Sequence, residues 1–313
     1  MPLSKDAEIV DTAKGLVSVL HKAAGGEHPG FRPAHAKGHL LTGTFTPTPK
    51  ASNLSKAPHF TAPSTPLTVR FSSSGGLPEI PDTDPQSNPR GIAIRFHLPD
   101  SNGRRQHTDI IAHSTKYFPT RTGGEFLEFL RRATGPDAGT AVPEFLGQHP
   151  ETVRFLEDPK PSPASFATES FFGVNAFKYV SAEGKETFVR NRIVPVAGLQ
   201  TLTAEETAGM SENYLFDELA GRLPFEFKLL AQVAEEGDVT DNATVLWPEE
   251  RELVELGTVK VESVLGGQES LDKQKSVIFD PIPRVEGVEA SADPLLEMRA
   301  NVYLVSGKER REA

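Results

Sequence analysis

Short segments in which apolar and polar residues alternate are the feature that most restricts the fold of this chain. Alternation with a period of two is typical of strands with one buried face, and the Pro, Gly, Asn and Asp clusters between the segments are typical of turns. A hairpin is predicted over 176–196, where FKYV and TFVRNRIV flank a turn at 182–185. The other predicted strands cover 39–47, 65–74, 91–99, 108–118, 225–234 and 252–264.

The spacing of apolar residues becomes helical in a few places around these strands. At the amino end, this spacing is followed by Ile9, Ala13, Leu16, Val17 and Leu20. Further helices are predicted over 123–134, 143–157, 203–221 and 293–305. About eight strands with helical excursions predict an α+β chain, a closed antiparallel β-barrel with appended helices. We expect the Pro-rich stretches to be loops within one domain that covers residues 1–313.

Charge and apolar content exclude several classes of protein. The formal net charge is −10 and the acids are spread along the chain, so the sequence offers no basic stripe to a nucleic acid. No apolar stretch approaches the roughly eighteen residues that a membrane-spanning helix needs. The amino end carries acids and has no continuous apolar run, so it is predicted to be an amphipathic helix and not a signal peptide. We therefore expect a cytoplasmic protein.

The chain contains no cysteine. This excludes disulfides, zinc–thiolate sites, iron–sulfur clusters, cysteine-ligated heme and thiol-based peroxidases. Any redox chemistry must therefore use another centre.

Three segments, FRPAHAKG, VRFSSS and RANVY, contain the candidate functional residues. Each candidate is weak when it is taken alone. A lone histidine is more often structural than catalytic, and a tyrosine on a late helix usually belongs to the core. The candidates are, in chain order, Arg32 and His35, Arg70 and Ser72, and Arg299 and Tyr303.

Taken together and in this order, the three segments resemble the catalase family. R-x-x-HAKG is similar to the signature around the family's distal histidine, and VRFS and PRGIAIRF follow it as they do in the family. SFFGVNAFKYVSAEG, the pair WP with ELVELGTVKV after it, and R-x-x-x-Y are similar to later family segments. The resemblance covers residues 28–305, and it implies a catalase-like barrel with heme inside it.

The resemblance implies heme b, with the phenolate of Tyr303 as the proximal iron ligand. A free phenol has a pKa of roughly 10, so a phenolate ligand needs a metal and a nearby cation. Arg299 lies four residues earlier on the same face of the predicted helix, where its guanidinium can donate to the phenolate oxygen. Arg32 and Arg70 match arginines that pair with the heme propionates.

The resemblance also implies an acid–base residue. His35 matches the distal histidine, which takes a proton from one peroxide oxygen and returns it to the leaving oxygen, with a ferryl heme as the product. Ser72 matches the serine that hydrogen-bonds this imidazole and fixes its tautomer. Because Arg70 and Ser72 lie two residues apart on one predicted strand, we expect both to face the interior of the barrel.

Three positions depart from the family pattern. Ser114, in DIIAHSTK, stands at the position of the family's distal asparagine, and His113 beside it is expected to point away. Serine is shorter and offers one donor, so we predict that it holds hydrogen peroxide less well and that dismutation is weakened. Asn88 replaces an aspartate before PRG, and Arg192 replaces a frequent histidine; neither change suggests a function.

The chain ends ten residues after Tyr303, where larger catalases continue with a further heme-contacting arginine, a wrapping segment and a helical domain. The comparison implies a more open heme edge, a monomer or homodimer, and no NADPH site. The basic carboxyl end, GKERREA, is predicted to be a solvated tail.

These features predict a heme peroxidase related to catalases. Such an oxidoreductase reduces hydrogen peroxide or organic hydroperoxides with electrons from a small-molecule donor, has at most weak catalase activity, and serves the response to oxidative stress.

Two alternatives stay open at this point. One is a fatty-acid hydroperoxide isomerase or lyase, similar to the catalase-related allene oxide synthases. Those enzymes have a threonine beside the distal histidine, whereas Ala34 stands here, which argues mildly against this alternative. The other is a heme carrier or peroxide sensor; His35 and Ser72 argue against it, because a binder needs no acid–base group.

Overall fold

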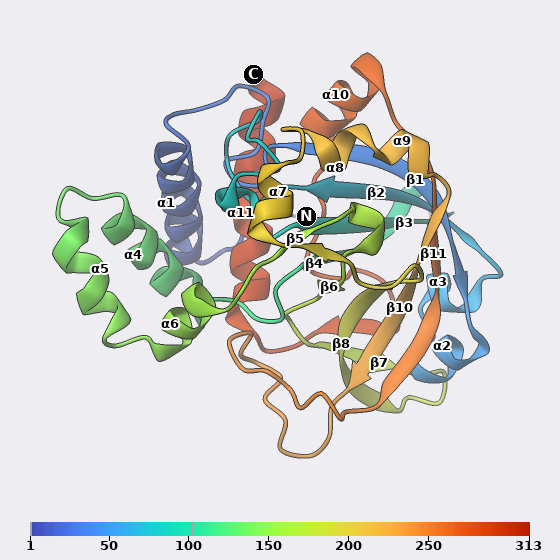
Figure 1. Cartoon of the computed structure of the whole chain (residues 1–313). Coiled ribbons are helices and arrows are strands. Elements are labelled where there is room, and N and C mark those ends of the chain that lie inside the picture. Colours follow the sequence, from blue (N-terminus) through green and yellow to red (C-terminus); the bar gives the residue numbers. More distant parts are fainter. Residues whose placement is uncertain (1, 102) are drawn as a thin grey trace.

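A closed antiparallel barrel forms one side of the computed structural model, which describes residues 2–101 and 103–313 (Figure 1). Pairing of the last strand of the ring with the first closes it, so the predicted closed barrel is confirmed. Among the described residues, eight strands follow one another around the ring in the order β10 (Phe225–Val233), β11 (Leu253–Val264), β1 (Gly38–Pro47), β2 (Thr65–Ser72), β3 (Gly91–Ser101), β4 (Arg104–His113), β6 (Phe171–Phe172) and β8 (Glu186–Pro195).

Shorter strands accompany the ring. β7 (Phe177–Val180) pairs with β8 in the predicted hairpin, and β12 (Val288–Ala290) pairs with β7. β5 (Ser162–Pro163) and β9 (Thr201–Leu202) form a separate pair. The strand predicted over 108–118 differs most from the observed one, because β4 begins at Arg104 and ends at His113.

Phenylalanine side chains fill the interior of the barrel. The ring of Phe71 on β2 lies 6.0 Å from that of Phe171 on β6 and 6.1 Å from that of Phe227 on β10, and all three are fully buried. Because side chains alternate along a strand, Arg70 and Ser72 lie on the outer face of β2. The expectation that these two residues face the barrel interior is therefore wrong.

Three helices pack together beside the barrel, as Figure 1 shows: α1 (Ala7–Ala23), α4 (Gly123–Ala133) and α11 (Pro294–Glu312). Each begins at a capping side chain that accepts a backbone N–H of the first turn, namely Asp6, Thr122 and Asp293. Their apolar faces meet in a cluster of Ala13, Leu16, Val19, Leu127 and Met298. Helices from the two ends of the chain therefore lie against each other. No helix of the described ranges is long and apolar enough to cross a membrane.

The remaining helices differ in part from the prediction. The helix predicted over 143–157 is two helices, α5 (Ala138–Leu146) and α6 (Pro150–Glu157), because Pro150 begins a new one. The helix predicted over 203–221 is broken into α7 (Ala204–Ala208), α8 (Tyr214–Asp217) and α9 (Leu219–Arg222). The helix α11 continues to Glu312, beyond the predicted end at 305. Helices absent from the prediction are α2 (Pro49–Leu54), α3 (Pro58–Thr61) and α10 (Gly267–Ser276).

Candidate functional site

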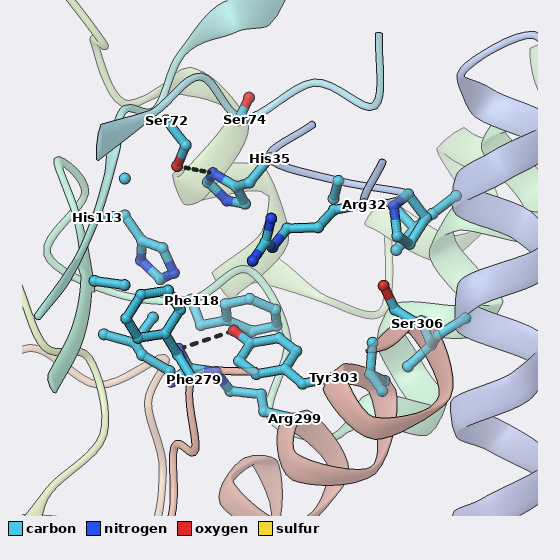
Figure 2. Close-up of a pocket in the computed structure, with 18 of the residues that line it drawn as sticks. Arg32, His35, Ser72, Ser74, His113, Phe118, Phe279, Arg299, Tyr303 and Ser306 are labelled. Atoms are coloured by element: carbon cyan, nitrogen blue, oxygen red, sulfur yellow. Dashed lines mark hydrogen bonds between the residues drawn. The ribbon is translucent and has the colours of Figure 1, made fainter. Parts of the chain in front are cut away.

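A cavity of about 400 Å³ lies between the outer faces of β2, β3 and β4 and the helices α1 and α11 (Figure 2). This cavity lies outside the barrel wall, whereas the resemblance implied a ligand inside the barrel. That expectation of the ligand's position is therefore wrong. The physical reason is the alternation along the strands, which directs phenylalanines inward and polar residues outward. The predicted site residues that line the cavity are Arg32, His35, Arg70, Ser72, Arg299 and Tyr303.

Three register partners on adjacent strands form the wall beneath His35. Ser72 pairs with Gly91, and Gly91 pairs with His113, so the three residues form one row across β2, β3 and β4. Nδ1 of His35 lies 3.0 Å from Oγ of Ser72. A Cβ atom at Gly91 would come within 3.0 Å of the His35 ring and 2.8 Å of Ser72 Oγ. The glycine therefore leaves a slot that the imidazole occupies.

The backbone of His35 is held in the left-handed region, with φ of 55°. A non-glycine residue adopts this conformation at a cost of about 1–3 kcal/mol, so the surrounding structure must enforce it. Two backbone hydrogen bonds do so: His35 N–H donates to Ser74 O, and Ala36 N–H donates to Gly75 O, each over 3.0 Å. Burial, and then the positive charge of Arg70, lowers the pKa of His35 to about 3. The imidazole is therefore neutral near pH 7.

The structure exchanges the expected positions of Ser114 and His113. His113 lines the cavity, and its ring lies nearly parallel to that of His35, with 6.2 Å between centroids and 17° between planes. Ser114 is not among the lining residues; its Oγ accepts the backbone N–H of Arg90 at 3.0 Å. The prediction that Ser114 faces the site is wrong because the register with Gly91 directs His113 outward at the end of β4.

Across the cavity, Tyr303 lies beside Arg299 on α11 (Figure 2). Nη2 of Arg299 donates to Oη of Tyr303 at 3.3 Å. Nη1 of Arg299 donates to Oδ1 of Asn175, and Nδ2 of Asn175 donates to Oδ2 of Asp293 at 2.8 Å. This chain of hydrogen bonds fixes the guanidinium against the phenol, as the four-residue spacing predicts.

A cluster of three arginines, the buried Arg70 and Arg310 and the half-buried Arg32, lines one edge of the cavity. The acceptors that they reach are backbone carbonyls, Ser306 and Gln274, and none forms an ion pair with a carboxylate in the described part of the chain. Burial lowers the pKa of Arg70 to about 9 and that of Arg310 to about 10. Buried cations without acidic partners are costly, so this edge is suited to an anionic ligand.

Arg310 is a lining residue that the sequence interpretation missed. It follows Tyr303 by seven residues, which is two turns of α11, and so lies on the same helix face. The structure therefore brings a further arginine to the cavity, where the sequence interpretation expected none. The rest of GKERREA is helical up to Glu312, and only Gly307 and Arg310 are buried, so the expectation of a solvated tail fails at these two residues and holds for the exposed ones. Nε of Arg310 is buried and has no hydrogen-bond partner among the described residues.

Apolar side chains complete the walls between the polar groups. They come from α1, α4, α11 and the loops after β4 and α10, and they include Leu20, Phe118, Phe126, Phe279, Leu295 and Val302. Neither Asn88 nor Arg192 is among the lining residues: Asn88 donates to Lys160 O at 3.2 Å, and Arg192 pairs with Glu249 at 2.8 Å. These two departures from the family pattern lie away from the cavity.

The structure is thus an antiparallel barrel with one apolar cavity, into which an imidazole and an arginine-bound phenol project beside a cationic edge. These features place the chain in the class of barrel proteins that bind an anionic ligand with a large apolar part. A sequence profile described as "Catalase" matches residues 27–311. The chain therefore belongs to the catalase family, whose members are heme-containing oxidoreductases that act on peroxides.

Individual relatives agree with this assignment. The catalase-related peroxidase of Mycolicibacterium paratuberculosis is 35% identical over 306 residues, which cover 92% of each chain. The catalase-related peroxidase of Synechococcus elongatus is 31% identical over 297 residues, which cover 91% of this chain and 85% of the relative. The crystal structure of a fungal catalase matches with a TM-score of 0.75 at 22% identity, over 94% of this chain and 62% of that one, and shows the shared fold.

Proposed function

We propose that this chain is a heme b peroxidase that reduces hydrogen peroxide or organic hydroperoxides with electrons from a small-molecule donor. One observation carries the proposal: His35, held by Ser72, and Tyr303, held by Arg299, face the same cavity from different elements of the fold. The two relatives named catalase-related peroxidase support the same activity.

The cavity residues fit a heme. The phenol of Tyr303 would ligate the iron, and Arg299 would stabilise its phenolate by donating to the same oxygen. The arginine cluster would pair with the propionates, and the Nε of Arg310, which finds no partner in the described part of the chain, supports this role. When it is bound, the heme supplies the metal site for peroxide and stores the oxidising equivalents that the donor later removes.

His35 would move the proton. Because its pKa is about 3, the imidazole is a neutral base at physiological pH. Nδ1 is engaged by Ser72, so Nε2 is the nitrogen left to accept a proton from one peroxide oxygen and return it to the leaving oxygen. The hydrogen bond to Ser72 orients the ring for both transfers, which is the role of the orienting residue in general acid–base catalysis.

We further propose that residues 1–313 act as one domain, because α1 and α11, from the two ends of the chain, line the same cavity. A monomer or homodimer and a cytoplasmic location stay predictions. The mass of the purified protein in solution tests the first, and fractionation of its host cells tests the second.

The test uses purified protein loaded with hemin. We expect a Soret band of a tyrosinate-ligated ferric heme and oxidation of an aromatic donor when hydrogen peroxide or tert-butyl hydroperoxide is added. His35→Ala should lose this turnover by roughly 10²-fold or more, whereas His97→Ala, on the exposed face of β3, should retain it. Loaded protein that oxidises no donor with any peroxide would contradict the proposal. Conversion of a lipid hydroperoxide without a donor would instead support the isomerase or lyase.

A further inference from the structure

Three charged side chains, Lys37, Asp82 and Arg90, form a buried cluster behind the wall beneath His35, and the proposed chemistry does not use them. Asp82 and Arg90 are 0% exposed and Lys37 is 8% exposed. Oδ1 of Asp82 lies 2.9 Å from Nζ of Lys37 and 3.8 Å from Nη1 of Arg90. Because charges removed from water are tolerated only where their partners are fixed, one carboxylate holds both cations in a defined arrangement.

Arg90 connects this cluster to the ends of three strands. Its Nη1 donates to Oγ of Ser73 at 2.8 Å, and its Nη2 donates to the backbone O of Asp82 at 2.6 Å. Its backbone exchanges two hydrogen bonds with Ser114: the N–H of Arg90 donates to Ser114 Oγ at 3.0 Å, and the N–H of Ser114 donates to Arg90 O at 2.9 Å. The residue after β2, the residue before β3 and the residue after β4 are therefore tied together.

The three residues that are tied together are the chain neighbours of the row beneath His35. The row is joined to them by three peptide bonds: Ser72–Ser73, Arg90–Gly91 and His113–Ser114. A peptide unit is rigid, so a displacement of one residue also displaces its neighbour. The position of the row, and with it the position of the imidazole, therefore depends on Arg90.

Lys37 joins the same cluster to the segment that carries His35. It lies two residues after His35, and its Nζ donates to Ile80 O at 2.8 Å and to Oδ1 of Asn213 at 2.7 Å. The N–H of Ser73 donates to Lys37 O at 3.1 Å, so the segment of His35 is also bonded to the end of β2. The left-handed backbone of His35 and the row beneath it are thus anchored to one carboxylate, which keeps the imidazole beside its serine partner (Figure 2).

We propose that Arg90, held by Asp82, is a positioning residue for the acid–base chemistry of His35. Through Ser73 it fixes Oγ of Ser72. This oxygen accepts the Nδ1 proton of the imidazole and so leaves Nε2 unprotonated, because the hydrogen bond at one ring nitrogen sets the tautomer. The inference deepens the proposed peroxidase function, and its consequence for turnover rests on that function.

Two variants disturb this arrangement, and a third is the matched control. Arg90→Lys keeps a charge beside Asp82 but loses the forked guanidinium, and Ser73→Ala removes only the hydroxyl that accepts Nη1. The control is Ser87→Ala. Ser87 is fully buried and its Oγ donates to Asp82 O at 3.2 Å, but neither of its chain neighbours belongs to the row.

Two quantities are measured on the full chain. The first is the tautomer of His35, from the NMR shifts of its isotope-labelled ring nitrogens, which are identified by their loss in His35→Gln; this measurement needs no heme. The second is kcat/KM for tert-butyl hydroperoxide after loading with hemin. We expect the Nδ1–H tautomer in the unchanged protein and in Ser87→Ala. Arg90→Lys and Ser73→Ala should show a mixture of tautomers and lose roughly tenfold in kcat/KM, whereas Ser87→Ala should stay within about twofold.

The inference is overturned if folded Ser73→Ala keeps the Nδ1–H tautomer, or if it loses this tautomer without losing turnover. It is also overturned if Ser87→Ala alters His35 as much as Ser73→Ala does, because the loss of any buried hydroxyl would then suffice. A cooperative thermal transition establishes that each variant is folded, and Ser73→Ala decides the outcome if Arg90→Lys does not fold. Failure of the proposed function looks different: the loaded, unchanged protein would oxidise no donor, while the tautomer would still report on Arg90.

Discussion

Gly91→Ala tests whether the slot beneath His35 controls the chemistry. A Cβ atom at this position would lie 3.0 Å from Cε1 and Nδ1 of His35 and 2.8 Å from Oγ of Ser72. Ordinary carbon contacts begin near 3.5 Å, so the ring must move by about half an ångström. It cannot do so freely, because the backbone of His35 is fixed in the left-handed region and Nδ1 is hydrogen-bonded to Ser72.

The expected loss of stability is modest and the expected loss of activity is large. Overpacking by one methyl group costs about 1–3 kcal/mol, and the reduced entropy of the unfolded chain offsets about 0.4–1 kcal/mol of it. The free energy of unfolding should therefore fall by about 1–2 kcal/mol. Displacement of His35 should remove most of its acid–base contribution, so kcat/KM for peroxide should fall by roughly 10²-fold.

The assays are steady-state donor oxidation and urea denaturation of the hemin-loaded protein. Gly139→Ala on α5 is the matched control, because a Cβ atom there would meet no atom of residues 2–101 or 103–313 within 4 Å. It should leave activity unchanged and raise stability by a few tenths to about 1 kcal/mol. If Gly91→Ala folds, binds heme and retains full turnover, the argument that the row of Ser72, Gly91 and His113 positions His35 is refuted.

Three further predictions concern other parts of the structure. His59 on α3 is buried against the rings of Phe60 and Phe96, and burial lowers its pKa to about 3 from the ordinary 6.5. Between these values the unfolded chain therefore binds a proton that the folded one does not. The free energy of unfolding therefore falls as pH falls through this window, by about 1.4 kcal/mol per pH unit. Urea denaturation at pH 4 and pH 7 should show that this free energy differs less between the two pH values in His59→Leu than in the unchanged protein. An equal difference in the two proteins contradicts this. Arg310→Ala should weaken hemin binding by roughly tenfold in a spectroscopic titration, whereas the exposed Arg311→Ala should not, and equal affinities would remove Arg310 from the ligand site. Asn175→Ala should release Arg299 from its anchor, shift the visible bands of the bound heme and lower the thermal midpoint, and an unchanged spectrum would show that this anchor is not needed.

Alternation along the strands predicted the closed barrel, but it could not tell which face is inside. Phe71 is apolar and its neighbours Arg70 and Ser72 are polar, so the sequence places them on opposite faces of β2. Resemblance to a family with buried heme then suggested that the polar face is the inner one. The structure reverses this, because one buried phenylalanine from each of five strands packs into the interior: Phe45, Phe71, Phe96, Phe171 and Phe227.

Two further features could not be predicted from the sequence: which of two adjacent residues at the end of β4 faces the cavity, and how far α11 extends. His113 and Ser114 are adjacent, and only the pairing of Gly91 with His113 decides which of them faces the cavity. Pairing depends on contacts between strands, which a single sequence does not display. Arg310 lies among basic and acidic residues that look solvated; the seven-residue spacing from Tyr303 was the signal that could have identified it.

Because the cavity lies on the outer face of β2, the register of this strand determines both the packing of the barrel core and the placement of the cavity residues. A slip of one residue in the pairing of this strand would turn Arg70 and Ser72 into the phenylalanine interior and expose Phe71 to the ligand. Such a slip would bury a charge in an apolar core, so the folded chain resists it strongly. The aromatic packing in the barrel interior therefore also holds Arg70 and Ser72 on the cavity face, so a core substitution that weakens the register of β2 is expected to disturb the site as well as the fold.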